Sequence, residues 1–269
     1  MTKATASRRL AALEEALGAR LVERKPNGLE LTLAGREVVS AADSIQGTIA
    51  SLEAKVAAAA DDKPRGTVRL TAPQWLASRL LVPALPELKS SFPELEVLLV
   101  GTNEVLNLAQ READLALRNV PPSHQSLVSR KVMELGGCVY ASKLYIERRG
   151  IPAGRDSLRG HDILAYGTLG GMPGFEWLRD SDDHGGSIAF RANDPESLVS
   201  AATAGLGLAA VPCLLGDAES SLIRVPSLGF SRCDMFLVTH EQIRSTPRIV
   251  AVSRFVVDLL NRHRRLIEG

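Results

Sequence analysis

The N-terminal segment of the chain carries an excess of side chains that attract anions. Residues 1–36 contain seven Lys and Arg residues against four Asp and Glu residues, a net charge of +3. Residues 37–65 sum to −2, and the rest of the 269-residue chain is neutral, so the overall formal charge is only +1. Because the positive charge is confined to one short segment, we expect an anionic partner for that segment and not for the body of the protein.

Side chains that could catalyse a reaction or bind a metal show no supporting pattern. The five histidines and three cysteines have no ligand spacing, so we expect no metal and no cofactor. The run 205–210, GLGLAA, fits Gly-x-Gly-x-x-Ala, but a dinucleotide site needs a strand before the run and a helix after it, and the reverse order is predicted here. A redox switch between Cys213 and Cys233 is a minor alternative to inert, buried thiols. We therefore expect no enzymatic activity.

Composition places the chain among ordinary globular proteins. Its 45% hydrophobic and 23% charged residues suffice for a large core, and its length suggests two domains. No stretch approaches the roughly 18 consecutive apolar residues of a membrane helix. The first ten residues lack the apolar core of a signal peptide, and three cysteines are too few for a disulfide scaffold. These features predict a cytoplasmic protein with no membrane partner.

The first 32 residues are predicted to form a helix followed by a hairpin. An apolar stripe with intervals of four and three residues runs along residues 4–17, and Gly18 would end this helix. Its members are Ala6, Leu10, Leu13 and Leu17. Two short strands, 21–24 and 29–32, flank a turn that contains Asn-Gly, a strong hairpin signal. A helix followed by a basic hairpin matches the second half of a winged helix-turn-helix.

A long helix is predicted over residues 33–62, with Thr32 as its N-cap. Its apolar residues recur at alternating intervals of four and three and form an unbroken heptad seam. They are Val38, Ala42, Ile45, Ile49, Leu52, Val56 and Ala59. A small hairpin cannot bury so long a seam, so we expect a second copy of the helix to cover it in a homodimer or homotetramer. Packing on the chain's own body is the alternative. Residues 61–66, with Pro and Gly, predict a linker.

Residues 66–269 are predicted to form an α/β domain, because short apolar runs alternate with helical patterns. We expect mainly parallel strands flanked by helices, with a second subdomain (about 150–230) inserted into a first one (about 66–149 and 231–269). The predicted strands are residues 67–71, 95–100, 114–117, 128–134, 137–141, 163–166, 187–191, 208–211, 222–225 and 235–239.

Ligands of open α/β sheets bind beyond the carboxyl ends of the strands, next to helix N-termini. Residues at or just after five predicted strand ends are therefore candidate ligand contacts, and all of them except Pro73 are polar. They are Thr71, Pro73, Gln74, Thr102, Arg118, Thr168 and Asn193. Hydroxyl, amide and backbone N–H groups suit a small anion such as a carboxylate, and Arg118 would supply the countercharge. A purely structural ion pair is the alternative for Arg118.

Two N-terminal stretches carry a family resemblance. Residues 5–24, TASRRLAALEEALGARLVER, are similar to the DNA-binding signature of LysR-type transcriptional regulators, and residues 31–36, LTLAGR, resemble that family's entry to its linker helix. Similar landmarks follow at residues 66–70, 114–118, 205–212 and 237–247. The resemblance covers essentially the whole chain. It implies a ligand-responsive, DNA-binding regulator with a winged helix-turn-helix and a periplasmic-binding-protein-like effector domain of two α/β subdomains.

The same resemblance assigns roles to individual residues. It implies that the helix over residues 4–17 enters the major groove of double-stranded DNA. The residues matching the family's DNA contacts are Lys3, Ala4, Ser7 and Arg8 on this helix, and Arg24, Lys25 and Asn27 on the hairpin would reach the backbone or minor groove. A solvated surface charge is the alternative for any one of them. The resemblance also favours Thr71, Thr102 and Thr168 as lining a small-molecule cleft.

One departure from the family concerns the N-terminus. Members usually have about 30 further residues ahead of this point, which supply the helices that support the recognition helix. Either translation starts upstream of Met1, or the winged helix-turn-helix is incomplete. Without the supporting helices, the stripe of Leu10, Leu13 and Leu17 is expected to be exposed. An effector-binding protein without DNA function is therefore the main alternative. A solute-binding protein is disfavoured by the heptad helix and the missing signal peptide.

Overall fold

The computed structural model describes residues 3–25, 28–39, 41–42, 45, 63–102, 113–122, 124, 126–167 and 171–269. The chain divides into two compact units, Met1–Asp62 and Lys63–Gly269. The division falls within the stretch of alternating charge, Pro and Gly that the sequence predicts as a linker. No helix among the described residues is long and apolar enough to cross a bilayer.

The N-terminal unit contains the predicted helix and hairpin. Helix α1 spans Lys3–Leu17, and strands β1 (Val22–Lys25) and β2 (Gly28–Leu31) pair antiparallel, with Lys25 opposite Gly28. The carboxylate of Glu14 fixes the junction, since its Oε1 accepts hydrogen bonds from the backbone N–H groups of Leu21 (2.7 Å) and Val22 (3.2 Å). The helix therefore holds the base of the hairpin through one side chain.

Thr32 caps the following helix, as predicted. Its Oγ1 accepts a hydrogen bond from the N–H of Gly35 at 3.0 Å, and residues 33–39 are helical. On the predicted seam, Val38 is half-buried and Ala42 is exposed, while Ile45 is 60% exposed. Ile49, Leu52, Val56 and Ala59 lie outside the described residues. The covering of this seam by a second copy stays a prediction.

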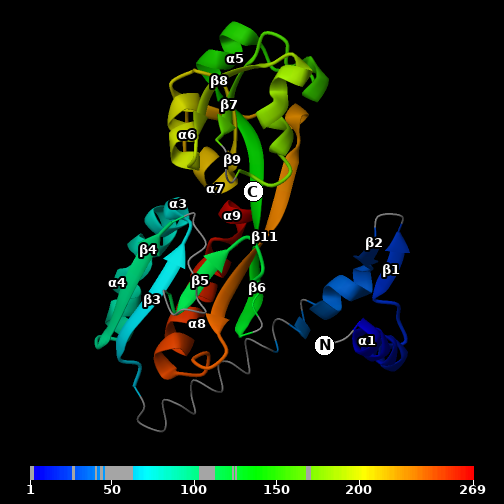
Figure 1. Ribbon diagram of the computed structural model, residues 1–269, viewed down its shortest axis with the longest axis vertical. Coiled ribbons are helices and arrows are strands. Elements are labelled where there is room, and N and C mark those ends of the chain that lie inside the picture. Colours follow the sequence, from blue (N-terminus) through cyan, green and yellow to red (C-terminus); the bar gives the residue numbers. More distant parts are fainter. Residues whose placement is uncertain are drawn as a thin grey trace. The chain divides into compact units, whose positions relative to one another are not determined.

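The larger unit is built on one mixed sheet with the strand order β4-β3-β5-β11-β6-β9-β7-β8, and β10 pairs with β6 (Figure 1). The described strands are β3 (Gly66–Ala72), β4 (Leu95–Gly101), β5 (Leu115–Arg118), β6 (Leu127–Ser142), β7 (Asp162–Tyr166), β8 (Ser187–Ala192), β9 (Leu208–Pro212), β10 (Leu222–Arg224) and β11 (Phe230–His240). Strands β3, β4 and β5 belong to a first lobe and strands β7, β8 and β9 to a second, and β6 and β11 run between the lobes (Figure 1).

Strands β3, β4 and β5 are parallel to one another, and so are β7, β8 and β9, but β6, β10 and β11 make only antiparallel pairs. The expectation of mainly parallel strands therefore holds for these two groups and is wrong for the long strands that connect them. Strand β3 pairs in parallel with β4 and β5, and β7 does so with β8 and β9, whereas β11 is antiparallel to β5 and β6, and β6 to β9. The expectation of separate strands at 128–134 and 137–141 is wrong. Both belong to β6, because β11 offers hydrogen-bonding partners along its whole length. The predicted architecture of two α/β subdomains is confirmed.

Helices cover the sheet in both lobes. They are α3 (Gln74–Leu76), the π-helix η1 (Ala77–Leu81), α4 (Val82–Ser91), α5 (Lys143–Arg149), the 3-10 helices η3 (Arg155–Ser157), η4 (Glu176–His184) and η5 (Pro226–Leu228), α6 (Pro195–Thr203), α7 (Cys213–Gly216), α8 (Pro247–Arg262) and α9 (Arg264–Glu268). The residue limits of the two subdomains stay predictions. Helix α5 precedes residue 150 but is bonded to β7, since the Tyr145 hydroxyl accepts from Asp162 N at 2.7 Å and Arg149 pairs with the Asp162 carboxylate.

A close backbone approach explains the glycine at position 207 in the run 205–210. The run follows α6 and leads into β9, so it is not a dinucleotide loop. A Cβ atom on Gly207 would lie 2.3 Å from the carbonyl oxygen of Asp162, which is backbone and has little room to move. We expect Gly207→Ala to lower the free energy of unfolding by about 1–3 kcal/mol. Denaturant unfolding measures this change.

A matched glycine provides the control. Gly154 has an extended backbone with φ 177°, and nothing lies within 4 Å of a Cβ placed there. Gly154→Ala is therefore expected to change the free energy of unfolding by less than about 0.5 kcal/mol. Equal effects of the two substitutions would contradict the close-approach explanation.

Candidate functional site

A buried positive charge lies at the strand ends of the first lobe. Strands β4, β3 and β5 are parallel neighbours, so their carboxyl ends meet at one edge. Arg118, the last residue of β5, is 9% exposed. Its Nη2 donates to Oγ1 of Thr71 at 2.7 Å, and its Nη1 donates to the carbonyl oxygen of Leu117 at 2.8 Å. Burial lowers the pKa of Arg118, yet an arginine stays charged at neutral pH.

Gln74 lies at the same edge, across the end of β4. A Cβ atom on Gly101 would be 2.1 Å from Oε1 of Gln74, so the absence of a side chain at Gly101 makes room for the amide. Pro73 is the N-cap of α3 and accepts the first helical hydrogen bond, from Ala77 N at 2.9 Å. Gln74 thus begins the helical stretch α3–η1–α4 with its amide laid over a neighbouring strand.

Thr102 completes the first-lobe group. Its backbone N–H donates to the carbonyl oxygen of Ala72 at 3.0 Å, which ties the segment after β4 to the end of β3. The structure therefore gathers five of the predicted ligand contacts at one edge of one sheet. They are Thr71, Pro73, Gln74, Thr102 and Arg118. Contact of these residues with a ligand stays a prediction.

The second lobe places Asn193 in a similar way. A Cβ on Gly167, just after β7, would lie 2.2 Å from Oδ1 of Asn193, so this amide also covers a strand-end glycine. The backbone N–H of Gly167 donates to Ala192 O at 2.8 Å and holds the ends of β7 and β8 together. Thr168 lies outside the described residues.

The structure contains an ion pair between the lobes that the sequence did not predict. Arg79 of η1 in the first lobe and Glu196 of α6 in the second lie 3.2 Å apart, measured from Nε to Oε1. Their side chains are 49% and 34% exposed. Arg79 follows Gln74 by five residues, and Glu196 follows Asn193 by three, so the pair bridges the segments that carry two predicted contacts. No sequence signal links residues separated by 117 positions.

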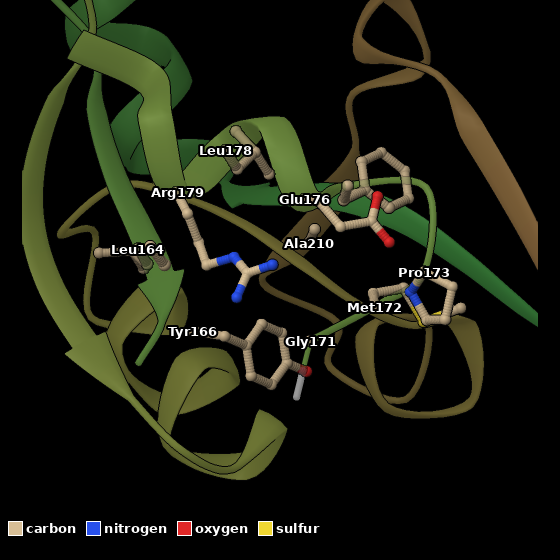
Figure 2. Close-up of a pocket in the computed structure, with 11 residues that line it drawn as sticks. Leu164, Tyr166, Gly171, Met172, Pro173, Glu176, Leu178, Arg179 and Ala210 are labelled. Carbon is tan, nitrogen blue, oxygen red and sulfur yellow. The ribbon is translucent and has the colours of Figure 1, made fainter. Parts of the chain in front are cut away.

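A cavity lies within the second lobe. Its volume is about 220 Å³, and its lining comes from β7, β9, the segment after Gly171 and η4 (Figure 2). Six of the seven predicted effector residues are described by the structure, and none of those six lines it. Apart from Arg179, Glu176 and the hydroxyl of Tyr166, its lining side chains are apolar.

The predicted DNA contacts are only partly described. Ser7 and Arg8 are exposed on α1, and Lys3 and Ala4 lie in the same helix. Arg24 and Lys25 lie in β1, and Asn27 lies outside the described residues. Leu13 and Leu17 are 41% and 51% exposed, as expected for this apolar stripe, whereas Leu10 is half-buried.

The described residues contain no cluster of His, Cys, Asp and Glu that could hold a metal ion. Cys138 and Cys213 are buried and Cys233 is partly buried, and none of the three forms a disulfide. Burial raises the pKa of each thiol, that of Cys233 to about 11. Thiols that stay protonated at neutral pH are poor nucleophiles, which disfavours the redox alternative for Cys213 and Cys233.

His161 gives the fold a pH dependence. It is 6% exposed, and its Nδ1 lies 3.3 Å from the hydroxyl of Tyr145. Burial, and then the charge of Arg149, lower the pKa of His161, while Asp162 raises it. Since the unfolded chain then binds the proton more readily, stability is retained above pH 6.5 and is lost as the pH falls from about 6.5 toward the lower folded-state pKa, by at most about 1.4 kcal/mol per pH unit.

Thermal unfolding between pH 5 and 8 measures this effect. We expect His161→Gln to flatten the acid limb of the stability curve, because it removes the buried ionisation. His124→Gln is the control, since His124 is exposed. An unchanged acid limb in His161→Gln would contradict the assignment.

Comparisons with known proteins agree over both units. The family described as "LysR substrate binding domain" matches residues 61–261, and "Bacterial regulatory helix-turn-helix protein, lysR family" matches residues 1–36. An HTH-type transcriptional regulator of Xanthomonas campestris pv. campestris is 32% identical over 97% of this chain and 78% of its own.

Solved structures of LysR-type regulators have a similar fold. CrgA, a LysR-type transcriptional regulator from Neisseria meningitidis, has a TM-score of 0.78 and 25% identity, over 97% of this chain and 90% of its own. AphB, the Vibrio cholerae virulence activator, has a TM-score of 0.57 and 22% identity, over 98% of this chain and 91% of its own. At that identity AphB supports the fold alone.

Proposed function

The chain belongs to the LysR family of bacterial transcriptional regulators, and from this premise we propose which residues bind DNA and which bind the effector. It is a ligand-responsive, DNA-binding regulator with a helix-turn-helix segment and an effector domain. This membership favours the regulator over an effector-binding protein without DNA function. It also suggests a protein that is not an enzyme, and we propose a cytoplasmic location.

Helix α1 is the DNA-reading element in this proposal. Ser7 and Arg8 are exposed on it, and Lys3 and Ala4 precede them on the same helix. Arg8 suits a guanine edge or a phosphate, and Ser7 and Lys3 suit phosphate oxygens. Arg24, Lys25 and Asn27 of the hairpin contact the DNA backbone or the minor groove. The local charge of +3 in residues 1–36 supports this assignment.

The effector is a small carboxylate bound at the strand ends of the larger unit. The observation that carries this proposal is the buried guanidinium of Arg118, held by Thr71 at the carboxyl ends of β5 and β3. A fixed cation beside the hydroxyl of Thr71 can bind both oxygens of a carboxylate. The amide of Gln74 lies at the same edge of the sheet, over the end of β4. Pro73 and Thr102 complete the first-lobe side, and Thr168 and Asn193 contribute from the second lobe.

Effector binding is coupled to DNA binding through the relative position of the lobes. A ligand held by residues of both lobes favours the arrangement in which both can reach it. A second copy of the chain covers the heptad seam, which consists of Val38, Ala42, Ile45, Ile49, Leu52 and Val56. The resulting homodimer or homotetramer places two α1 helices on adjacent half-sites of the DNA. The 60% exposure of Ile45 supports this pairing.

The ion pair between Arg79 and Glu196 is expected to influence the distance between the lobes. Charge reversal in Arg79→Glu should place two carboxylates together and shift the lobes apart, and adding Glu196→Arg should restore the original distance. Because both side chains are partly exposed, the coupling free energy should be about 0.2–1 kcal/mol. Distances between spin labels on the two lobes measure the shift. Identical distances in all variants would contradict a bridging role.

The DNA-binding role is tested by selecting fragments of the source organism's genome on the purified full chain and footprinting the retained fragments. We expect protection of two half-sites related by a dyad and separated by about one helical turn or a multiple of it. Failure of a folded, oligomeric preparation to retain any fragment would overturn the assignment of α1 to DNA.

A further inference from the structure

The cavity of the second lobe has the size and chemistry of a small-molecule pocket. It measures about 220 Å³, whereas an engineered apolar cavity of roughly 150 Å³ accommodates benzene. The additional space admits one ring with a short substituent. Strands β7 and β9 contribute Leu164, Ala165, Tyr166 and Ala210, and η4 with the segment before it contributes most of the opposite wall (Figure 2).

The two charged side chains that line this pocket, Arg179 and Glu176, point in different directions. Figure 2 shows the guanidinium of Arg179 reaching toward the side where Tyr166 and Gly171 lie, while the carboxylate of Glu176 points away from it. Both oxygens of Glu176 accept from Gly174 N at 3.0 Å. Within the described part of the chain, the guanidinium of Arg179 makes no hydrogen bond or ion pair. The pocket therefore presents a guanidinium that no described side chain pairs with, and it lies beside apolar walls and apart from the Glu176 carboxylate (Figure 2).

The hydroxyl of Tyr166 adds a neutral donor. Burial raises the pKa of Tyr166, so the phenol keeps its proton at neutral pH. A carboxylate beside Arg179 could accept hydrogen bonds from the guanidinium and from this phenol, while the rest of the molecule contacts Leu164, Phe175 and Leu178. Such a combination of apolar walls and a few convergent polar groups is typical of small-molecule sites.

We infer that the second lobe contains a ligand pocket of its own, which binds a monocarboxylate with an aromatic or compact apolar body. The pocket is separate from the strand-end site proposed above, since it includes none of Thr71, Gln74 or Arg118 and lies inside one lobe. Its occupant would pack between the sheet and η4. The protein thus has two anchoring cations, Arg118 and Arg179, in different sites.

Trp177 allows this pocket to be observed in the full chain. It lies in η4 between the lining residues Glu176 and Leu178, and the chain has one other tryptophan, Trp75. In a Trp75→Phe background, titration with benzoate is expected to change the emission of Trp177, and calorimetry gives an independent affinity. Benzamide, which is uncharged, and acetate, which has no apolar body, should each bind at least tenfold more weakly.

Variants locate the binding. Arg179→Met should weaken benzoate at least tenfold and remove the preference for benzoate over benzamide. Ala210→Leu should block both ligands by filling the cavity from β9. Arg159→Met removes an exposed charge of the second lobe that does not line the cavity, and it should leave the affinity within twofold. If Ala210→Leu does not fold, the ratio of the benzoate and benzamide affinities in Arg179→Met still shows whether benzoate binds at Arg179.

Arg118→Met separates this inference from the proposed effector site. Unchanged benzoate binding in Arg118→Met, with loss in Arg179→Met, supports the second-lobe pocket. Loss in Arg118→Met with retention in Arg179→Met would overturn the pocket and leave the strand-end site standing. Absence of binding by benzoate, phenylacetate and cyclohexanecarboxylate below about 1 mM would also overturn it.

Discussion

Arg118→Met should weaken effector binding by about 30-fold or more, because loss of one partner from a buried, charged hydrogen-bonded pair costs roughly 2–5 kcal/mol. Methionine is apolar and close in length, so the substitution removes the charge that Thr71 orients and leaves the space filled. At a ligand concentration 100 times the dissociation constant, the stabilisation should fall from about 2.7 to about 0.9 kcal/mol. Thermal unfolding of the full chain with a series of small carboxylates measures this loss.

Two variants of Thr71 are the matched controls. Thr71→Ser keeps the hydroxyl that accepts from Arg118, whereas Thr71→Val keeps the shape and removes the acceptor. We expect Thr71→Ser to retain most of the stabilisation and Thr71→Val to lose much of it. The carboxylate chosen must still stabilise Arg179→Met, so that binding in the second lobe is not measured instead. If such a carboxylate stabilised Arg118→Met as strongly as the wild-type protein, the strand-end site would be wrong.

Arg8→Ala should lower the affinity for the selected DNA by about 5- to 150-fold, equivalent to the 1–3 kcal/mol of one good arginine–base contact. Arg8 is exposed on α1, and its guanidinium is the strongest candidate there for reading a guanine edge. Fluorescence anisotropy at a fixed salt concentration measures the change, since salt alone alters such affinities greatly.

The neighbouring Arg9 offers a charge-matched control. It is also exposed on α1, but consecutive residues of a helix point about 100° apart, so Arg9→Ala should have a much smaller effect. Arg8→Lys separates base reading from phosphate binding, since a bidentate guanine contact is weakened by lysine, whereas a phosphate contact is retained. Equal effects of Arg8→Ala and Arg9→Ala would show that only net charge matters and would contradict a specific role for Arg8.

Local patterns in the sequence were sufficient to predict many elements. The helix over residues 4–17, the hairpin after it and the N-cap at Thr32 depend on periodicity, turn residues and capping, which act over a few positions. Family resemblance added the two-lobed effector domain. The strand-end rule also predicted that Thr71, Gln74 and Arg118 would lie at one edge of the sheet, because the carboxyl ends of parallel neighbours share an edge.

Long-range packing decided the rest. The sequence could not show that 128–134 and 137–141 form one strand, because only pairing with β11 holds both halves together. Nor could it join Arg79 to Glu196, or reveal the cavity beside Arg179, since these depend on surfaces brought together from distant segments. Periodicity, capping and turn chemistry thus determined the elements, and tertiary packing alone decided which charges became neighbours and where space was left inside the second lobe.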